Sequence, residues 1–156
     1  MSITKIVRKV FEPRQKELEK HFNQGKALQE AVLGRLVAEA QDTEYGRNHA
    51  FASIKGYDDF AKHIPVNTYE ELKESIDRMR HGETDVLWPG RVKWYAKSSG
   101  TTNDKSKFIP VSKEGLKRIH YRGGFDAVAM YLQNNPKSRM FDGKGLILGG
   151  SHAPNY

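Results

Sequence analysis

The sequence predicts an α/β fold in which N-terminal helices pack on the start of a mixed sheet. Three patterns indicate this class. Before residue 85, apolar residues recur at helical spacing. Two short runs rich in β-branched and aromatic residues, 92–96 and 108–111, are typical of strands and enclose a polar loop. A third apolar run, 146–148, is followed by Gly-Gly-Ser, as in the interior of many α/β folds.

Composition limits the classes of protein to which the chain can belong. Its 156 residues are enough for one domain with its own core. No apolar run approaches the roughly 20 residues of a membrane span, and residues 1–9 lack the apolar stretch of a signal peptide. Cysteine is absent, which excludes disulfides, thiolate nucleophiles and cysteine-based zinc sites. We therefore expect a cytoplasmic protein that does not enter a membrane.

The positive charge is concentrated in the C-terminal part of the chain. Residues 1–90 carry 14 Lys+Arg and 15 Asp+Glu, a net charge of −1. Residues 91–156 carry 12 Lys+Arg and 4 Asp+Glu, a net charge of +8. Such an excess indicates either an anionic partner or a solvated basic face.

The first 40 residues predict two helices. Apolar residues over 3–22 share one helical face, with a break or kink expected near Pro13 and a stop at Gly25. A second stripe over 27–40 predicts an amphipathic helix whose apolar face packs on the core.

Two further helices are expected before residue 85. Residues 57–63 favour a short helix, which ends before Pro65 because the residue preceding a proline avoids the helical region. Thr68 and Glu71 stand three residues apart, the pattern of a capping box. The helix that they start is expected to end before Gly82.

The remaining elements surround the polar loop. The turn at 88–90 leads into a strand-loop-strand region over 91–112, after which Ser112 can cap a helix that continues towards Asn134. Gly123-Gly124 lies inside this helical pattern, weakens it by roughly 1 kcal/mol per glycine, and suggests the close approach of another backbone.

The loop over 97–107 has the sequence Lys-Ser-Ser-Gly-Thr-Thr-Asn-Asp-Lys-Ser-Lys. It has no large apolar side chain with which to fill a core, but it can supply backbone N–H groups, hydroxyl donors and positive charge, the groups that bind a polyphosphate. It is not a P-loop, because Lys105 stands where the second glycine is required. It forms neither a dinucleotide fingerprint nor the nucleophile elbow of a hydrolase. Composition alone also fits an ordinary flexible loop.

Other candidate chemistry is sparse. No two histidines have His-x-x-x-His spacing, so no metal site is predicted. The acidic pairs Asp58-Asp59 and Glu70-Glu71 stand at helix starts and are typical of caps or solvated charge. Trp88, Trp94 and Tyr95 could stack on bases, but aromatic residues that flank strands more often belong to the core.

The segment 95–112, Tyr-Ala-Lys-Ser-Ser-Gly-Thr-Thr-Asn-Asp-Lys-Ser-Lys-Phe-Ile-Pro-Val-Ser, resembles a known motif. It is similar to the phosphate-binding motif of the auxin-responsive (Gretchen Hagen) acyl acid amido synthetases, in a form seen in their bacterial relatives, within the adenylate-forming superfamily. Several upstream stretches resemble the family's N-terminal pattern, in the same order: Tyr45-Gly46, 51–54, Phe60, 64–66, Tyr69-Glu70, Ile76, 82–83 and 87–90. The resemblance covers most of the chain from Tyr45 onwards.

The resemblance implies a binding site and a reaction. The residues that it assigns to the β- and γ-phosphates of ATP are Ser98, Ser99, Gly100, Thr101 and Thr102, and Lys107 takes the position of the family's loop lysine. Asn103 stands where many relatives carry glycine, although asparagine also tolerates the left-handed backbone region. The implied cofactors are ATP and Mg²⁺, and the substrates are a carboxylic acid and an amino acid. The acid becomes an acyl-adenylate, which the amine converts to an amide.

Family enzymes are several times longer than this chain. The resemblance therefore implies that 1–156 is the N-terminal part of an adenylate-forming domain, with a helical region 1–85, the phosphate-binding region 91–112, and a helix and strand over 113–150. The catalytic residues, the adenine pocket and the magnesium-binding acid are then expected after Tyr156, and the chain alone is expected to be inactive.

Two other functions stay open from the sequence. One is a thioester-forming acyl-CoA ligase on the same scaffold. The other is a basic nucleic-acid-binding module, which the +8 region and the nearby aromatic residues favour. The basic residues form no regular helical stripe and no known nucleic-acid motif, so no nucleic-acid partner is expected. The sequence does not define an oligomeric state.

Overall fold

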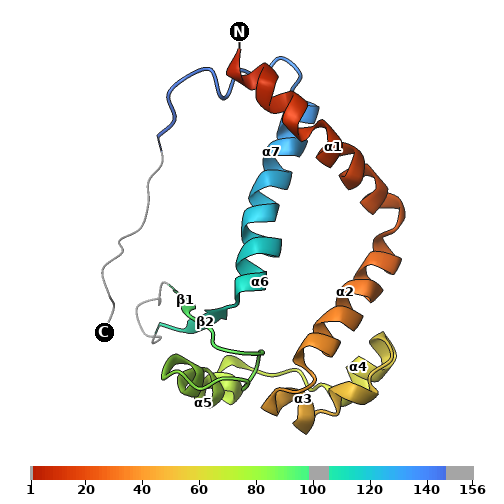
Figure 1. Ribbon diagram of the computed structural model, residues 1–156, viewed down its shortest axis with the longest axis vertical. Coiled ribbons are helices and arrows are strands. Elements are labelled where there is room, and N and C mark those ends of the chain that lie inside the picture. Colours follow the sequence, from red (N-terminus) through yellow and green to blue (C-terminus); the bar gives the residue numbers. More distant parts are fainter. Residues whose placement is uncertain (1, 99–105, 147–156) are drawn as a thin grey trace. The chain divides into compact units, whose positions relative to one another are not determined.

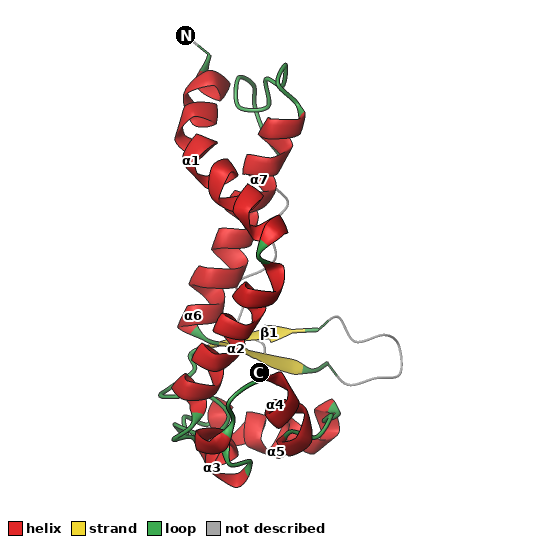
Figure 2. Cartoon of the chain, turned by 90° about the vertical axis from the view of Figure 1, so that its right-hand side faces the viewer, coloured by secondary structure: helices red, strands yellow, loops and turns green. Residues whose placement is uncertain are grey.

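The computed structural model describes residues 2–98 and 106–146, which form mainly helices and one small sheet (Figures 1 and 2). Strands β1 (Trp94–Lys97) and β2 (Phe108–Val111) pair antiparallel. The predicted α/β class is confirmed. The helical elements are α1 (Ile3–Asn23), α2 (Gly25–Ala40), α3 (Glu44–Asn48), a 3₁₀ turn (Phe51–Ser53), α4 (Tyr57–His63), α5 (Tyr69–Arg80), α6 (Lys113–Gly115), a π-helical segment (Leu116–Tyr121) and α7 (Arg122–Asn134).

The chain divides into two compact units. One is formed by residues 1–20 and 124–156, and the other by residues 21–123. Helix α1 pairs with α7 in the first unit, whereas the second contains α2 to α5, the β-hairpin and α6. The candidate loop therefore belongs to the second unit.

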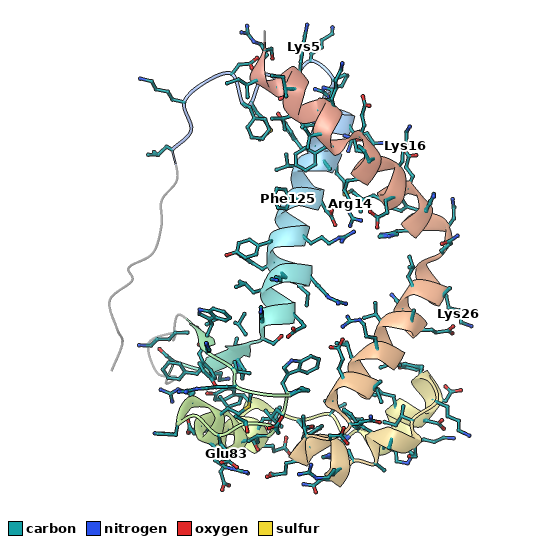
Figure 3. The ribbon with its side chains drawn as sticks, in the orientation of Figure 1. Lys5, Arg14, Lys16, Lys26, Glu83 and Phe125 are labelled. Carbon is teal, nitrogen blue, oxygen red and sulfur yellow. The ribbon has the colours of Figure 1, made fainter. Side chains whose placement is uncertain are left out.

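An ion pair joins α1 to α7 in the first unit. The Arg14 guanidinium donates to both oxygens of the Asp126 carboxylate, at 2.6 and 2.7 Å. The rings of Phe11 and Phe125 lie 6.0 Å apart nearby, and Figure 3 labels Arg14 and Phe125 on the two helices. Asp126 raises the pKa of Arg14 above its ordinary value, so the charge is retained although the side chain is mostly buried.

The break expected at Pro13 is wrong, because α1 runs through that residue without interruption. A proline inside a helix removes one backbone hydrogen bond and costs about 3 kcal/mol. Contacts on both sides of Pro13 offset this cost. Arg8 donates to the Leu132 carbonyl, and the Gln15 side chain donates to the Ala129 carbonyl at 2.9 Å.

Asp142 fixes the start of α1. Its carboxylate accepts hydrogen bonds from the Thr4 backbone N–H at 3.0 Å and from the Ser2 hydroxyl at 2.7 Å. The buried Thr4 hydroxyl in turn accepts the Phe141 backbone N–H at 3.1 Å. The bond from Thr4 satisfies a backbone donor that the first turn of a helix leaves unpaired, and the other two tie that turn to residues 141–142.

Helix α5 is the helix that the capping box predicted. The Thr68 backbone N–H donates to the Glu71 carboxylate at 2.6 Å, and Gly82, just past the helix end, has φ +101°. The helix buries Ile76 and Met79. Met79 packs with Val86 and Val92, so the end of α5, the following turn and the approach to β1 share one small core.

The predicted stop at Gly25 and the predicted packing of the next helix both need correction. Gly25 is the first residue of α2, and the interruption falls at Gln24. Only Val37 and Ala40, in the last turns of α2, are buried. Val32 and Leu36 are exposed, and Leu28 and Leu33 are only half-buried.

The helical segment after the hairpin begins as predicted. Ser112 is the N-cap, and its hydroxyl accepts the Gly115 N–H at 2.9 Å. The helix continues through the π-helical segment into α7 and includes Gly123 and Gly124. The close backbone approach expected at these glycines is absent in the described structure, since a Cβ at either would meet nothing within 4 Å. The predicted strand over 146–148 has only Leu146 within the described residues, where no strand is assigned.

Replacing Asp126 with Asn should lower the free energy of unfolding by about 2 kcal/mol, because a mostly buried guanidinium loses one of its two charged partners and keeps only Glu17. Urea denaturation measures this loss. Glu30→Gln is the control, because its pair with Lys26 spans 3.9 Å and both side chains are largely exposed. That change should cost less than about 0.5 kcal/mol. Equal losses in the two variants would contradict the role of the Arg14–Asp126 pair.

The hydrogen bonds at Asp142 predict a pH dependence of stability. Bonds from Thr4 and Ser2 lower the pKa of Asp142 below its ordinary value. The unfolded chain therefore takes up this proton at a higher pH than the folded chain. The stabilisation is complete above the ordinary value near pH 4 and is lost as the pH falls below it. Unfolding free energies at pH 6 and pH 3 should differ less in Asp142→Asn than in the unaltered chain. An equal difference would refute the anchoring role of Asp142.

Candidate functional site

The β-hairpin presents the candidate loop from a closed base. Trp94 pairs with Val111 and Lys97 pairs with Phe108. Beyond the last pair, the Ser98 backbone N–H donates to the Lys107 carbonyl at 2.9 Å. The Lys107 N–H donates to the Ser98 hydroxyl oxygen, also at 2.9 Å. These two bonds hold the ends of the loop together.

The structure brings together two of the six predicted phosphate-binding residues. Ser98 and Lys107 face each other across the base of the hairpin. The other four, Ser99, Gly100, Thr101 and Thr102, lie outside the described residues. Because Ser98 Oγ only accepts in its bond to the Lys107 N–H, its hydroxyl hydrogen remains available to donate to a phosphate oxygen.

Helix α5 supports one side of the hairpin. The Tyr69 hydroxyl accepts the Phe108 backbone N–H at 3.0 Å, and its ring centroid lies 5.5 Å from Lys107 Nζ. At the other end of α5, the Arg80 guanidinium lies 3.7 Å from the centroid of the Phe108 ring. These cation–π contacts orient both basic side chains.

From the sequence, Tyr69 belongs only to a stretch that resembles the family's N-terminal pattern, and Arg80 has no predicted role. Tyr69 lies 39 residues from its hydrogen-bond partner Phe108. An aromatic residue in the first turn of a helix is too common to signal such a contact, and no local pattern could have identified it.

The hairpin also borders an apolar hollow of about 650 Å³. This size is typical of small-molecule sites. Its walls come from the turn before β1, from both strands and from the start of the following helix, and include Trp88, Val92, Ala96, Pro110, Leu116 and Ile119. Such a surface suits an apolar ligand.

Neither a metal centre nor a membrane span is found in the described part of the chain. Among residues 2–98 and 106–146, no three His, Asp or Glu side chains are grouped so as to hold a metal ion. The helices described there are also too short or too polar to cross a membrane.

The fold and the hairpin place the chain among α/β proteins that present a polar, glycine-containing loop between two strands. Residues 14–154 match the GH3 family N-terminal domain, and the chain belongs to that family. The resemblance found from the sequence is thereby confirmed.

The relatives include plant amido synthetases. The chain is 30% identical over 123 residues to indole-3-acetic acid-amido synthetase GH3.15 of Arabidopsis thaliana, covering 78% of this chain and 20% of that protein. It is 35% identical over 92 residues to the probable indole-3-acetic acid-amido synthetase GH3.1 of Arabidopsis thaliana, covering 58% of this chain and 16% of that protein.

The solved structure of the AtGH3.15 acyl acid amido synthetase in complex with 2,4-DB superposes with a TM-score of 0.67 and 28% identity. The match covers 76% of this chain and 21% of that structure. The chain thus spans about a fifth of the length of the relatives it matches.

The contact between α5 and β2 predicts the effect of Tyr69→Phe. This change removes the hydroxyl that accepts the Phe108 N–H and retains the ring beside Lys107. It should cost about 1 kcal/mol of unfolding free energy and accelerate hydrogen exchange at the Phe108 amide. Tyr57→Phe is the control, because the Tyr57 side chain is 69% exposed. Unchanged exchange at Phe108 would contradict this anchoring.

Proposed function

We propose that the chain is the N-terminal part of an ATP-dependent acyl acid amido synthetase and that its hairpin loop binds the β- and γ-phosphates of ATP. The observation that carries this proposal is the closed base of the loop, where Ser98 and Lys107 meet within a region that matches the family. The similarity to amido synthetases favours an amide product over a thioester.

The loop contributes binding and positioning, not a covalent step. In the proposed reaction, a carboxylate oxygen attacks the α-phosphorus of ATP, pyrophosphate leaves, and an amine then attacks the acyl carbon and releases AMP. No protein nucleophile is required, so a chain without cysteine can take part. Ser98, Ser99, Thr101 and Thr102 donate hydroxyl hydrogen bonds, Gly100 allows close approach of the backbone, and Lys107 offsets the negative charge of the departing pyrophosphate.

Mg²⁺ bound with ATP would neutralise phosphate charge. The described residues contain no group of three or more His, Asp or Glu side chains placed to hold a metal ion. The apolar hollow beside the hairpin is suited to the apolar part of a carboxylic acid. We place the protein in the cytoplasm, where ATP is available.

We further propose that these 156 residues do not complete the reaction alone. They correspond to about a fifth of each matched amido synthetase. Release of pyrophosphate from ATP by the purified chain, with a carboxylic acid and an amino acid supplied, would refute this part of the proposal.

Calorimetric titration with Mg·ATP tests the assignment of the loop. Gly100→Ala and Lys107→Ala should each weaken binding at least tenfold, because the first change obstructs the backbone and the second removes a positive charge. The control is Lys55→Ala, which removes the same charge from an exposed position of the same unit. Absence of ATP binding to the folded chain, or equal weakening by the control, would contradict the assignment.

A further inference from the structure

A second hollow, of about 360 Å³, lies between the C-terminal end of α5 and the segment that enters β1. Its walls carry four basic side chains, together with Val92 and Tyr95: Arg80, His81, Arg91 and Lys93. No acidic residue lines it. We call it the basic hollow.

The small core beside α5 brings these basic side chains together. Met79, Val86 and Val92 are all buried and pack together, so the chain that leaves α5 must return beside the end of the helix. Gly82 permits the reversal with φ +101°, and a Cβ at this position would lie 3.5 Å from the Arg91 guanidinium. Side chains from both segments therefore line the same hollow.

Stabilisation of the C-terminal end of α5 does not explain all four basic side chains of the hollow. Cations near the C-terminus of a helix offset its partial negative charge, and α5 already ends with Arg78, Arg80 and His81. Arg78 pairs with Glu44 and Glu83. Arg91 and Lys93 lie outside the helix, and within the described chain they have no salt bridge.

The basic hollow has free donor capacity. Arg80 uses one guanidinium nitrogen in its 2.8 Å pair with Asp77 and retains its other N–H groups. His81 Nδ1 lies 2.7 Å from the Asp77 carbonyl, which can only accept, so the Nδ1 hydrogen is used in this bond and His81 lines the hollow without a free donor there. Burial raises the pKa of the Tyr95 phenol, whereas the charges of Arg80 and Arg91 lower it, which places both guanidinium groups near Tyr95.

The basic hollow is separate from the candidate ATP loop. Tyr95 lies at the entry of β1, whereas the loop begins after its last residue, Lys97. At about 3.3 Å per residue, Tyr95 and Ser98 are about 10 Å apart along the strand.

We propose that the basic hollow binds a small anion that carries two or more phosphate groups. A planar guanidinium group can donate two parallel hydrogen bonds to the oxygens of one phosphate, and a lysine adds a compact positive charge. The volume suits a diphosphate or a compact nucleotide. Free pyrophosphate and the diphosphate of a nucleotide share this chemistry. The proposal does not depend on ATP binding by the loop.

The test is calorimetric titration of the full 156-residue chain with inorganic pyrophosphate at low salt. Arg91→Ala/Lys93→Ala should weaken binding at least tenfold. The control, Lys55→Ala/Lys62→Ala, removes the same charge from exposed positions in the same unit and should change binding less than twofold. These titrations are made in the Gly100→Ala background, which weakens any binding of pyrophosphate by the loop, so that the remaining binding reports on the basic hollow. Equal weakening in the two double variants, or no binding to the Gly100→Ala chain, would overturn the proposal.

NMR titration of the unaltered chain gives a result that does not depend on how the variants fold. Pyrophosphate should shift the amide signals of residues 80–82 and 91–95, whereas signals of α4 should stay in place. Titration with ADP distinguishes free pyrophosphate from a nucleotide as the ligand, because tighter binding of ADP than of pyrophosphate would indicate a nucleotide. Shifts only at Ser98 and 106–107 would place pyrophosphate in the loop instead. Preferential, steeply salt-dependent binding of duplex DNA by the same residues would also overturn the proposal.

Discussion

The unit that contains the hairpin depends on the burial of three apolar side chains, Met79, Val86 and Val92, whose exposed fractions are 1%, 2% and 6%. They come from the end of α5, the following turn and the approach to β1. Removing such side chains from water stabilises a fold by roughly 1.5–3 kcal/mol each. The cluster is small, so each member carries a large share of the stability of this region. It also places the hairpin directly beside α5.

The backbone of the turn beside this cluster also caps the neighbouring helix, α3. The carbonyl groups of Asp85 and Val86 accept the N–H groups of Glu44 and Tyr45, at 2.7 and 3.0 Å. These are N–H groups that the first turn of α3 would otherwise leave unpaired. Thr43 completes the turn by accepting the Gly46 N–H at 3.0 Å. The side chains of this turn thus contribute to the core, and its backbone carbonyl groups cap α3.

Local patterns predicted the features that local physics determines. The Thr68–Glu71 capping box, the Ser112 cap and the two strands around the loop each depend on residues close in sequence, and each is confirmed. The continuity of α1 through Pro13 was not predictable in this way. It depends on contacts with α7, more than a hundred residues away in sequence.

The candidate site shows the same division between local and distant determinants. The sequence indicated the loop and its lysine, because the motif is a continuous stretch. The roles of Tyr69 and Arg80 beside the hairpin were not predicted, because their contacts with β2 form only when α5 packs on the hairpin. Val32 and Leu36 of α2 show the converse, since the apolar stripe of that helix predicted burial that packing does not provide for them. Periodicity identifies the face of a helix, but not whether a partner covers that face.

The two proposed anion sites differ in the physics of binding. The loop offers mainly hydroxyl and backbone donors with Lys107, a set that holds phosphate oxygens in a defined geometry. The basic hollow relies on full charges carried by long side chains, so its binding is screened more strongly by salt. Both are positioned by the same contact between α5 and the hairpin. A change that loosens the Met79–Val86–Val92 cluster would therefore disturb both sites together, whereas changes confined to either set of side chains would separate them.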